Sequence, residues 1–172
     1  INTIRDRFGI AILLVRYIAS ETPELVANRV RLVFIGDLSR LSQTCRTAME
    51  TSMAQTTHNP GLTLNVAVNY GGRAEIVQAV RRLAQSVREG SLAPQDITEE
   101  TVSDYLYTAG QPDPDLLIRT GGDMRLSNFL LYQSSYAELY MPEILWPDFD
   151  REAYWAALRD FAGRDRRFGR VR

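Results

Sequence analysis

The pattern of apolar and polar residues divides the chain into two kinds of segment. A short, nearly continuous apolar run at 30–36 and the segment at 62–70 are typical of strands, and the first is apolar enough that we expect both of its faces to be buried. A third strand is expected at Leu116–Ile118. Elsewhere apolar residues recur at helical spacing, which predicts helices at 10–27, 40–56, 73–88, 99–107 and 150–161.

The order of these segments predicts the fold class. Strands that alternate with helices indicate an α/β protein with a mainly parallel central sheet flanked by helices. We expect Pro23 to break the first helix or to begin a new first turn, and Thr98 to cap the helix at 99–107. A length of 172 residues suits one domain, so we predict a single domain over residues 1–172.

The ends of the predicted strands are the natural place for a ligand. Ligands of parallel sheets bind beyond the carboxyl ends of the strands. The second and third strands both run into a glycine pair there, Gly71-Gly72 and Gly121-Gly122. Asn65, Asn69 and Arg73 flank the first pair, and we expect them to serve as turn and cap residues.

Composition and charge narrow the functional class. The net charge is −1, without the basic excess that nucleic-acid binding requires, so we expect no nucleic-acid partner. Cys45 is the only cysteine, which excludes a disulfide framework within the chain and favours a reducing, cytoplasmic location. All 20 basic residues are arginine, so any anion site must use planar guanidinium groups.

Residues around the second glycine pair suit a diphosphate. Arg119 leaves the third strand, and Arg125 and Ser127 follow the glycine turn, which can bring them back toward the same point. Two guanidinium groups and a hydroxyl match the many acceptor oxygens of a diphosphate. The alternative is a surface turn in which the two arginines pair with Asp123 and Asp115. Spacing alone leaves both open.

Three other features admit two interpretations each. Glu138 lies in the apolar stretch SSYAELY, where a carboxylate either pairs with an arginine or helps substrate phosphates to hold Mg²⁺. The tail at 163–172 contains five arginines, which predicts a solvated tail, an anion site shared with a neighbouring subunit, or attraction to an acidic membrane surface. His58, the only histidine, lies in the turn-like THNPG and is interpreted as a loop residue.

Several segments together resemble one family. They are LTLNVAVNYGGRAEIVQAV, PDLLIRTGGDMRLSNFLLYQSSYAELY, LWPDFD and the terminal RRFG. This set resembles the cis-prenyltransferases, especially the bacterial undecaprenyl diphosphate synthases, over residues 13–170. The resemblance implies a Mg²⁺-dependent transferase that adds isopentenyl diphosphate units, with cis double bonds, to an allylic diphosphate such as farnesyl diphosphate.

The resemblance also assigns roles by position. By this resemblance, the residues that would bind the diphosphate of isopentenyl diphosphate are Arg119, Arg125, Leu126 and Ser127. Glu138 would help to bind Mg²⁺. Arg167 and Gly169 match the family's Arg-x-Gly signature, which reaches the active site of a partner subunit and so implies a homodimer. A lipid product implies peripheral association with a membrane.

Parts of the family pattern, among them the Ser-x-Glu-Asn-Trp segment, have no counterpart in this sequence. The Asp-Gly-Asn-Gly-Arg loop, with its catalytic aspartate, and the strands around it are missing, so the chain corresponds to the C-terminal two thirds or so of the family domain. Either the N-terminal part exists outside this sequence, or the chain lacks it and is inactive alone. Two other functions stay open: a non-catalytic partner subunit that supplies the Arg-x-Gly tail, and a general anion-binding α/β module, although no P-loop is present.

Overall fold

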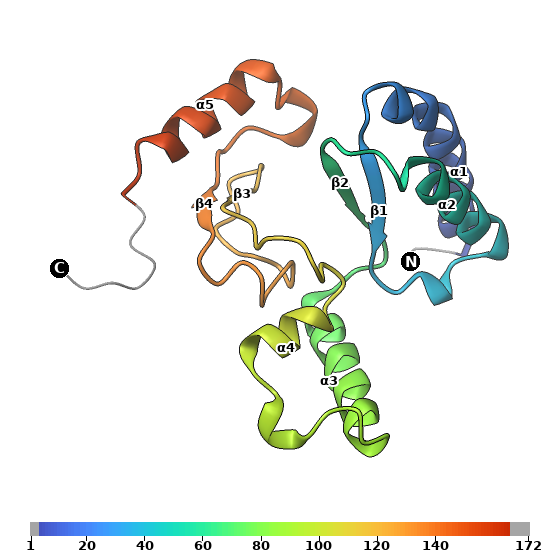
Figure 1. Ribbon diagram of the computed structural model, residues 1–172. Coiled ribbons are helices and arrows are strands. Elements are labelled where there is room, and N and C mark those ends of the chain that lie inside the picture. The colour runs from blue at the N-terminus through green and yellow to red at the C-terminus, as the bar shows by residue number, and fades with distance from the viewer. Residues whose placement is uncertain (1–3, 166–172) are drawn as a thin grey trace. The chain divides into compact units, whose positions relative to one another are not determined.

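The chain forms two compact units. The computed structural model describes the backbone of residues 4–165 and the side chains of residues 13–165. Its contacts divide the chain into unit 1, Ile1–Tyr70, and unit 2, Gly71–Arg172. Figure 1 shows the elements of each unit. The prediction of one domain over residues 1–172 stays a prediction.

Unit 1 is a pair of parallel strands covered by two helices. Its elements are α1 (Ile4–Ala27), β1 (Arg31–Ile35), a 3-10 turn (Leu38–Arg40), α2 (Gln43–Thr56) and β2 (Thr63–Ala67). β1 and β2 pair in parallel with Leu32 opposite Leu64. The helices α1 and α2 pack together beside β1 (Figure 1). A core of Ile18, Leu32, Phe34 and Met49 lies between these elements.

Two expectations for unit 1 need correction. The break expected at Pro23 is wrong, because α1 continues through it to Ala27. The turn before Pro23 is held by Thr22, whose Oγ1 donates to the carbonyl of Ile18 (2.6 Å) and lies within hydrogen-bond distance (2.9 Å) of Oγ of Ser52 on α2. The burial expected for both faces of β1 holds for Leu32, Phe34 and Ile35 but not for Arg31, which is exposed.

The second helix of unit 1 starts later than its apolar pattern suggests. It begins at Gln43 because the hydroxyl of Ser42 accepts a hydrogen bond from the backbone N–H of Cys45 (3.3 Å) and caps the helix. The 3-10 turn at Leu38–Arg40 takes the residues before it. Asn69 adopts a left-handed conformation (φ 48°), and its Nδ2 donates to the carbonyl of Asp37 (2.8 Å), which confirms its expected role as a turn residue.

Unit 2 contains the second parallel pair. Its elements are α3 (Gly72–Arg88), α4 (Glu99–Asp104), β3 (Leu116–Ile118), β4 (Glu138–Tyr140), α5 (Arg151–Ala162) and 3-10 turns at Pro94–Asp96 and Trp146–Asp148. β3 and β4 pair in parallel with Leu117 opposite Leu139. Thr98 forms a capping box at α4, which confirms it as the cap, and Asp150 caps α5. The sequence pattern missed β4, whose three residues are too few to show a period.

The predicted fold class is confirmed. Both units place helices beside strands, and within the described residues the strands pair in parallel, β1 with β2 and β3 with β4. Such pairing brings the carboxyl ends of neighbouring strands to one edge. In unit 2 this edge lies beyond Ile118 and Tyr140, where the predicted diphosphate residues follow.

Candidate functional site

The glycine turn after β3 fixes the position of Arg119. The Arg119 N–H donates to the carbonyl of Tyr140 (2.9 Å), which extends the pairing of β3 with β4 by one residue. The N–H groups of Gly121 and Gly122 donate to the carbonyls of Ile144 (2.8 Å) and Pro142 (3.0 Å). Both glycines have positive φ, 92° and 74°, a conformation that glycine adopts without steric penalty. The turn is therefore attached to the segment that leaves β4.

Three charged side chains meet at this turn. Nη2 of Arg119 lies 2.9 Å from Oδ2 of Asp123, and Nη2 of Arg125 lies 2.5 Å from the same oxygen. Nη1 of Arg119 also donates to the carbonyl of Arg125 (2.6 Å). The pairing with Asp123 that the surface-turn interpretation expects is thus present for both arginines. Two cations share one carboxylate, so the cluster retains a net positive charge.

A cavity opens beside this cluster. It has a volume of about 380 Å³ and is lined by Leu117, Ile118, Arg119, Thr120, Leu126, Ser127 and Phe129. Three of the four residues predicted to bind the diphosphate lie on its wall, and the fourth, Arg125, is linked to it through Asp123. The wall combines a guanidinium and hydroxyls with apolar side chains. Such a cavity suits a ligand with one anionic and one apolar end.

The turn after Arg125 has an unusual backbone. Ser127, Asn128 and Leu130 have φ values of 48°, 65° and 43°, in the left-handed region that residues other than glycine rarely adopt. The carbonyl of Asn128 accepts from the N–H of Gly72 (2.7 Å), and its Oδ1 accepts from the N–H of Arg73 (2.8 Å). The expected cap chemistry at Arg73 is therefore supplied by Asn128. Sequence reasoning missed both Asn128 and the cavity residue Thr120.

Glu138 is held by an arginine in the structure. Its Oε2 lies 2.9 Å from Nη1 of Arg164, and Arg164 also pairs with Asp160 (2.5 Å) and donates to the carbonyl of Leu139 (3.0 Å). The hydrogen bond to Glu138, followed by the one to Asp160, raises the pKa of Arg164 above its ordinary value. The arginine pair expected as one interpretation of Glu138 is thus present.

The described residues do not form a metal site by themselves. No group of three or more His, Cys, Asp or Glu side chains among them could hold a metal ion. Glu138 offers one carboxylate, and its Oε2 is already bonded to Arg164. A single carboxylate does not complete the oxygen coordination that Mg²⁺ requires, so substrate phosphates would have to supply the other ligands. Arg167 and Gly169, the residues of the expected Arg-x-Gly signature, lie outside the described residues.

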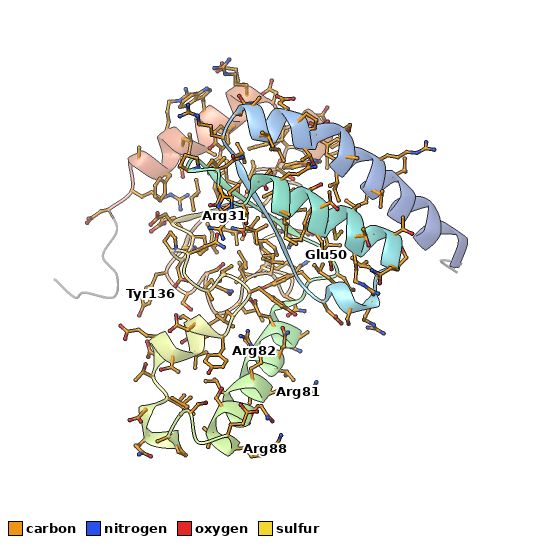
Figure 2. The ribbon with its side chains drawn as sticks, turned by 45° about the vertical axis from the view of Figure 1, so that its right-hand side comes forward. Arg31, Glu50, Arg81, Arg82, Arg88 and Tyr136 are labelled. Atoms are coloured by element: carbon orange, nitrogen blue, oxygen red, sulfur yellow. The ribbon has the colours of Figure 1, made fainter. Side chains whose placement is uncertain are left out.

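A second cavity of unit 2 was not indicated by the sequence. It has a volume of about 440 Å³ and is lined by Gln78, Arg81, Arg82, Gln85, Ser86 and Tyr105. Figure 2 shows Arg81, Arg82 and Arg88 on α3. Arg82 donates to the carbonyl of Tyr105 (3.1 Å), and its guanidinium carbon lies 5.1 Å from the centre of that ring. Arg82 of α3 is therefore held by Tyr105, the residue that follows α4.

Other single candidates behave as expected or carry no chemistry. His58 lies in the turn that follows α2, as interpreted from the sequence. Cys45 is buried in α2. In the part of the chain that the structure describes, no helix combines the length and apolar character needed to cross a bilayer.

Comparison with known proteins identifies the family. Residues 5–169 match the family model described as "Putative undecaprenyl diphosphate synthase", so the chain belongs to this prenyltransferase family. It is 48% identical to an isoprenyl transferase of Porphyromonas gingivalis, over 92% of this chain and 63% of that protein. It is 50% identical to a ditrans,polycis-undecaprenyl-diphosphate synthase, (2E,6E)-farnesyl-diphosphate specific, of Yersinia pseudotuberculosis, over 91% of this chain and 62% of that protein.

Solved structures agree with this result. Lavandulyl diphosphate synthase from Lavandula x intermedia, in complex with dimethylallyl diphosphate, has a TM-score of 0.93 and 35% identity and covers 98% of this chain and 73% of its own. The resemblance to the family that the sequence motifs indicated is thereby confirmed. The chain spans about three fifths of the length of the two curated relatives named above.

Proposed function

We propose that this protein is a cis-prenyltransferase that lengthens an allylic diphosphate, such as farnesyl diphosphate, with isopentenyl diphosphate units. The observation that carries the proposal is the cavity at the end of β3, where Arg119 and Ser127 share a wall with Leu117, Leu126 and Phe129. Isopentenyl diphosphate has the matching form, an anionic diphosphate on a short branched hydrocarbon. The farnesyl-diphosphate specificity in the name of the Yersinia relative supports the choice of allylic substrate.

The arginines at the turn would bind the diphosphate of isopentenyl diphosphate. Arg119 is largely covered, with 23% of its side chain exposed, whereas Arg125 is 65% exposed, so a ligand can reach it from solvent. Charge-assisted hydrogen bonds of this kind contribute about 1.5–3 kcal/mol each. A diphosphate carries more charge than Asp123 and would compete with it for both guanidinium groups. The hydroxyl of Ser127 would donate a further hydrogen bond.

Magnesium, the partner subunit and the location complete the proposal. Glu138 would supply one ligand to Mg²⁺ and the substrate diphosphates the others, which requires Glu138 to leave Arg164. Arg167 and Gly169 would reach a second copy of the chain in a homodimer. We place the protein in the cytoplasm, with a lipid product that brings it to the membrane surface. The relatives named above carry enzyme names, which favours an enzyme over a non-catalytic subunit.

The test is the affinity for isopentenyl diphosphate, measured by titration calorimetry on the purified protein. Arg119→Ala should weaken binding by at least about tenfold, since it removes one charge-assisted contact. Arg81→Ala is the matched control, because it removes the same charge from α3 in the same unit and should leave the affinity unchanged. Equal affinities of Arg119→Ala and the unmodified protein would contradict the site. Chain elongation with farnesyl diphosphate, labelled isopentenyl diphosphate and Mg²⁺ then tests the reaction.

A further inference from the structure

We propose that Asn128 is a positioning residue. It joins the segment 126–131 to the first turn of α3 and thereby holds Leu126 and Ser127 at the wall of the cavity. Asn128 is not itself among the residues that line the cavity. The identity of the ligand rests on the proposed function, whereas the contact between the two segments rests on the structure alone.

Asn128 acts as the N-terminal cap of a helix that lies 55 residues earlier in the chain. The first N–H groups of a helix have no partner within the helix and need one from outside. In α3 the residue at the cap position is Gly71, which provides no side-chain hydrogen bond. Asn128 supplies the missing acceptors: its carbonyl accepts from the N–H of Gly72 (2.7 Å), and its Oδ1 accepts from the N–H of Arg73 (2.8 Å).

The two segments approach too closely for a side chain at either glycine. A Cβ on Gly72 would lie 2.9 Å from Cγ of Leu131 and 3.1 Å from its backbone nitrogen. A Cβ on Gly71 would lie 2.9 Å from Nδ2 of Asn128. Contacts below 3.0 Å require atoms to shift. Because the glycine pair has no side chains, the segment 126–131 can pack against the N-terminal end of α3.

A second contact, made just after this segment, lies one turn further along α3. Nε2 of Gln133 donates to Oε1 of Glu75 (3.1 Å) and to Oγ1 of Thr108 (3.1 Å). Gln133 and Glu75 are 2% and 1% exposed, so this contact is shielded from water. Leu130 lies between the two contacts and Ser127 lies just before the first, and both share the left-handed backbone of Asn128, a conformation that asparagine tolerates better than serine or leucine does. The position of Ser127 thus depends on the end of α3.

Three substitutions at Asn128 separate the acceptor from the backbone conformation. Asn128→Asp keeps a side-chain acceptor and a residue that tolerates the left-handed region; Asn128→Gly keeps the conformation and loses the acceptor; Asn128→Ala loses both. Asp150→Ala is the matched control, because it removes the cap of α5 in the same unit, where Oδ1 accepts from the N–H of Ala153 (2.9 Å). Each protein is titrated with isopentenyl diphosphate and followed through thermal unfolding.

We expect Asn128→Ala to weaken binding by about tenfold, Asn128→Gly by about fivefold, and Asn128→Asp to stay within about twofold of the unmodified protein. Asp150→Ala should lower the unfolding midpoint without a change in affinity. If Asn128→Ala lowers the midpoint in the same way and leaves the affinity unchanged, Asn128 is only a structural cap and the inference is wrong.

Amide hydrogen exchange separates this inference from the proposed function. If the unmodified protein does not bind isopentenyl diphosphate, the proposed function is wrong, but exchange still tests the contact. Asn128→Ala should then speed exchange at Gly72 and Arg73 and, together with them, at residues 126–131. Faster exchange at Gly72 and Arg73 alone would show that the segment keeps its position without Asn128, which would overturn the inference.

Discussion

Two glycine pairs follow the second and third strands, and they serve different physical needs. At Gly71-Gly72 the need is space, because atoms of Asn128 and Leu131 would lie only 2.9 Å from an added Cβ. At Gly121-Gly122 the need is conformation, because both residues have positive φ. A Cβ on Gly121 would meet no atom within 4 Å.

The difference shows that the same dipeptide can hold a site in two ways. The first pair is packed closely against a segment distant in sequence and helps to position it. The second pair turns the chain so that Arg119 and Arg125 reach one carboxylate, that of Asp123. Residue type alone, which suggested a turn at both pairs, does not reveal that only the second is required for its backbone angles.

The largest effect is expected from Gly72→Ala. The added methyl would overlap the side chain and the backbone nitrogen of Leu131, and the backbone cannot rotate away. Insertion of a methyl into a packed contact costs about 1–3 kcal/mol. In urea unfolding, the free energy of unfolding of Gly72→Ala should therefore fall by an amount in the upper part of this range.

Gly71→Ala is the control for that measurement. Its methyl would meet only Nδ2 of Asn128, and a shift of that side chain would cost at most its hydrogen bond to the N–H of Arg73, so the loss of stability should be smaller. Equal losses at the two positions would show that helix-end conformation, and not the contact with Leu131, explains this pair.

The fold was largely predictable because its signals are local. Thr98 and Asp150 precede apolar helical patterns and cap the helices that follow, and the 116–118 strand is found where its apolar run lies. The strand β4 was not predictable, since its three residues are defined by their pairing with β3 and not by a period of their own.

The site was predictable as a set of residues but not as a set of contacts. Arg119, Leu126 and Ser127 line one cavity, and the diphosphate role that the family motifs assign to them stays a prediction. The contact of Asn128 with Arg73 spans 55 residues and that of Arg164 with Glu138 spans 26. Such contacts leave no periodic signal, because tertiary packing and not local sequence brings the partners together.

A smaller effect is expected from Gly121→Ala, which tests the conformational explanation of the second pair. An added Cβ at position 121 would have open space around it. Alanine at φ 92° should therefore lower the free energy of unfolding only by the conformational penalty, about 1–2 kcal/mol. Gly121→Asn should lose less than Gly121→Ala, since asparagine tolerates positive φ better. At position 72, by contrast, asparagine should be no less destabilising than alanine. Urea unfolding measures the stability of each variant. A Gly121→Ala protein as stable as the unmodified one would contradict the explanation.

The smallest effect on stability is expected from Asp123→Asn, which leaves the second turn intact and changes only its charges. Half-exposed ion pairs contribute little, so the free energy of unfolding should fall by less than about 1 kcal/mol. Affinity for inorganic pyrophosphate should rise by about threefold, because the carboxylate that competes for Arg119 and Arg125 is lost, and the gain should shrink as salt is added.

Asp104→Asn provides the control for Asp123→Asn. It removes the same charge from an exposed position at the end of α4 and should leave pyrophosphate affinity unchanged. Weaker binding by Asp123→Asn would reverse the interpretation of the turn: Asp123 would then orient the two guanidinium groups for the ligand and not compete with it. The second glycine pair would in that case position its segment through a side chain, as the first pair does through Asn128.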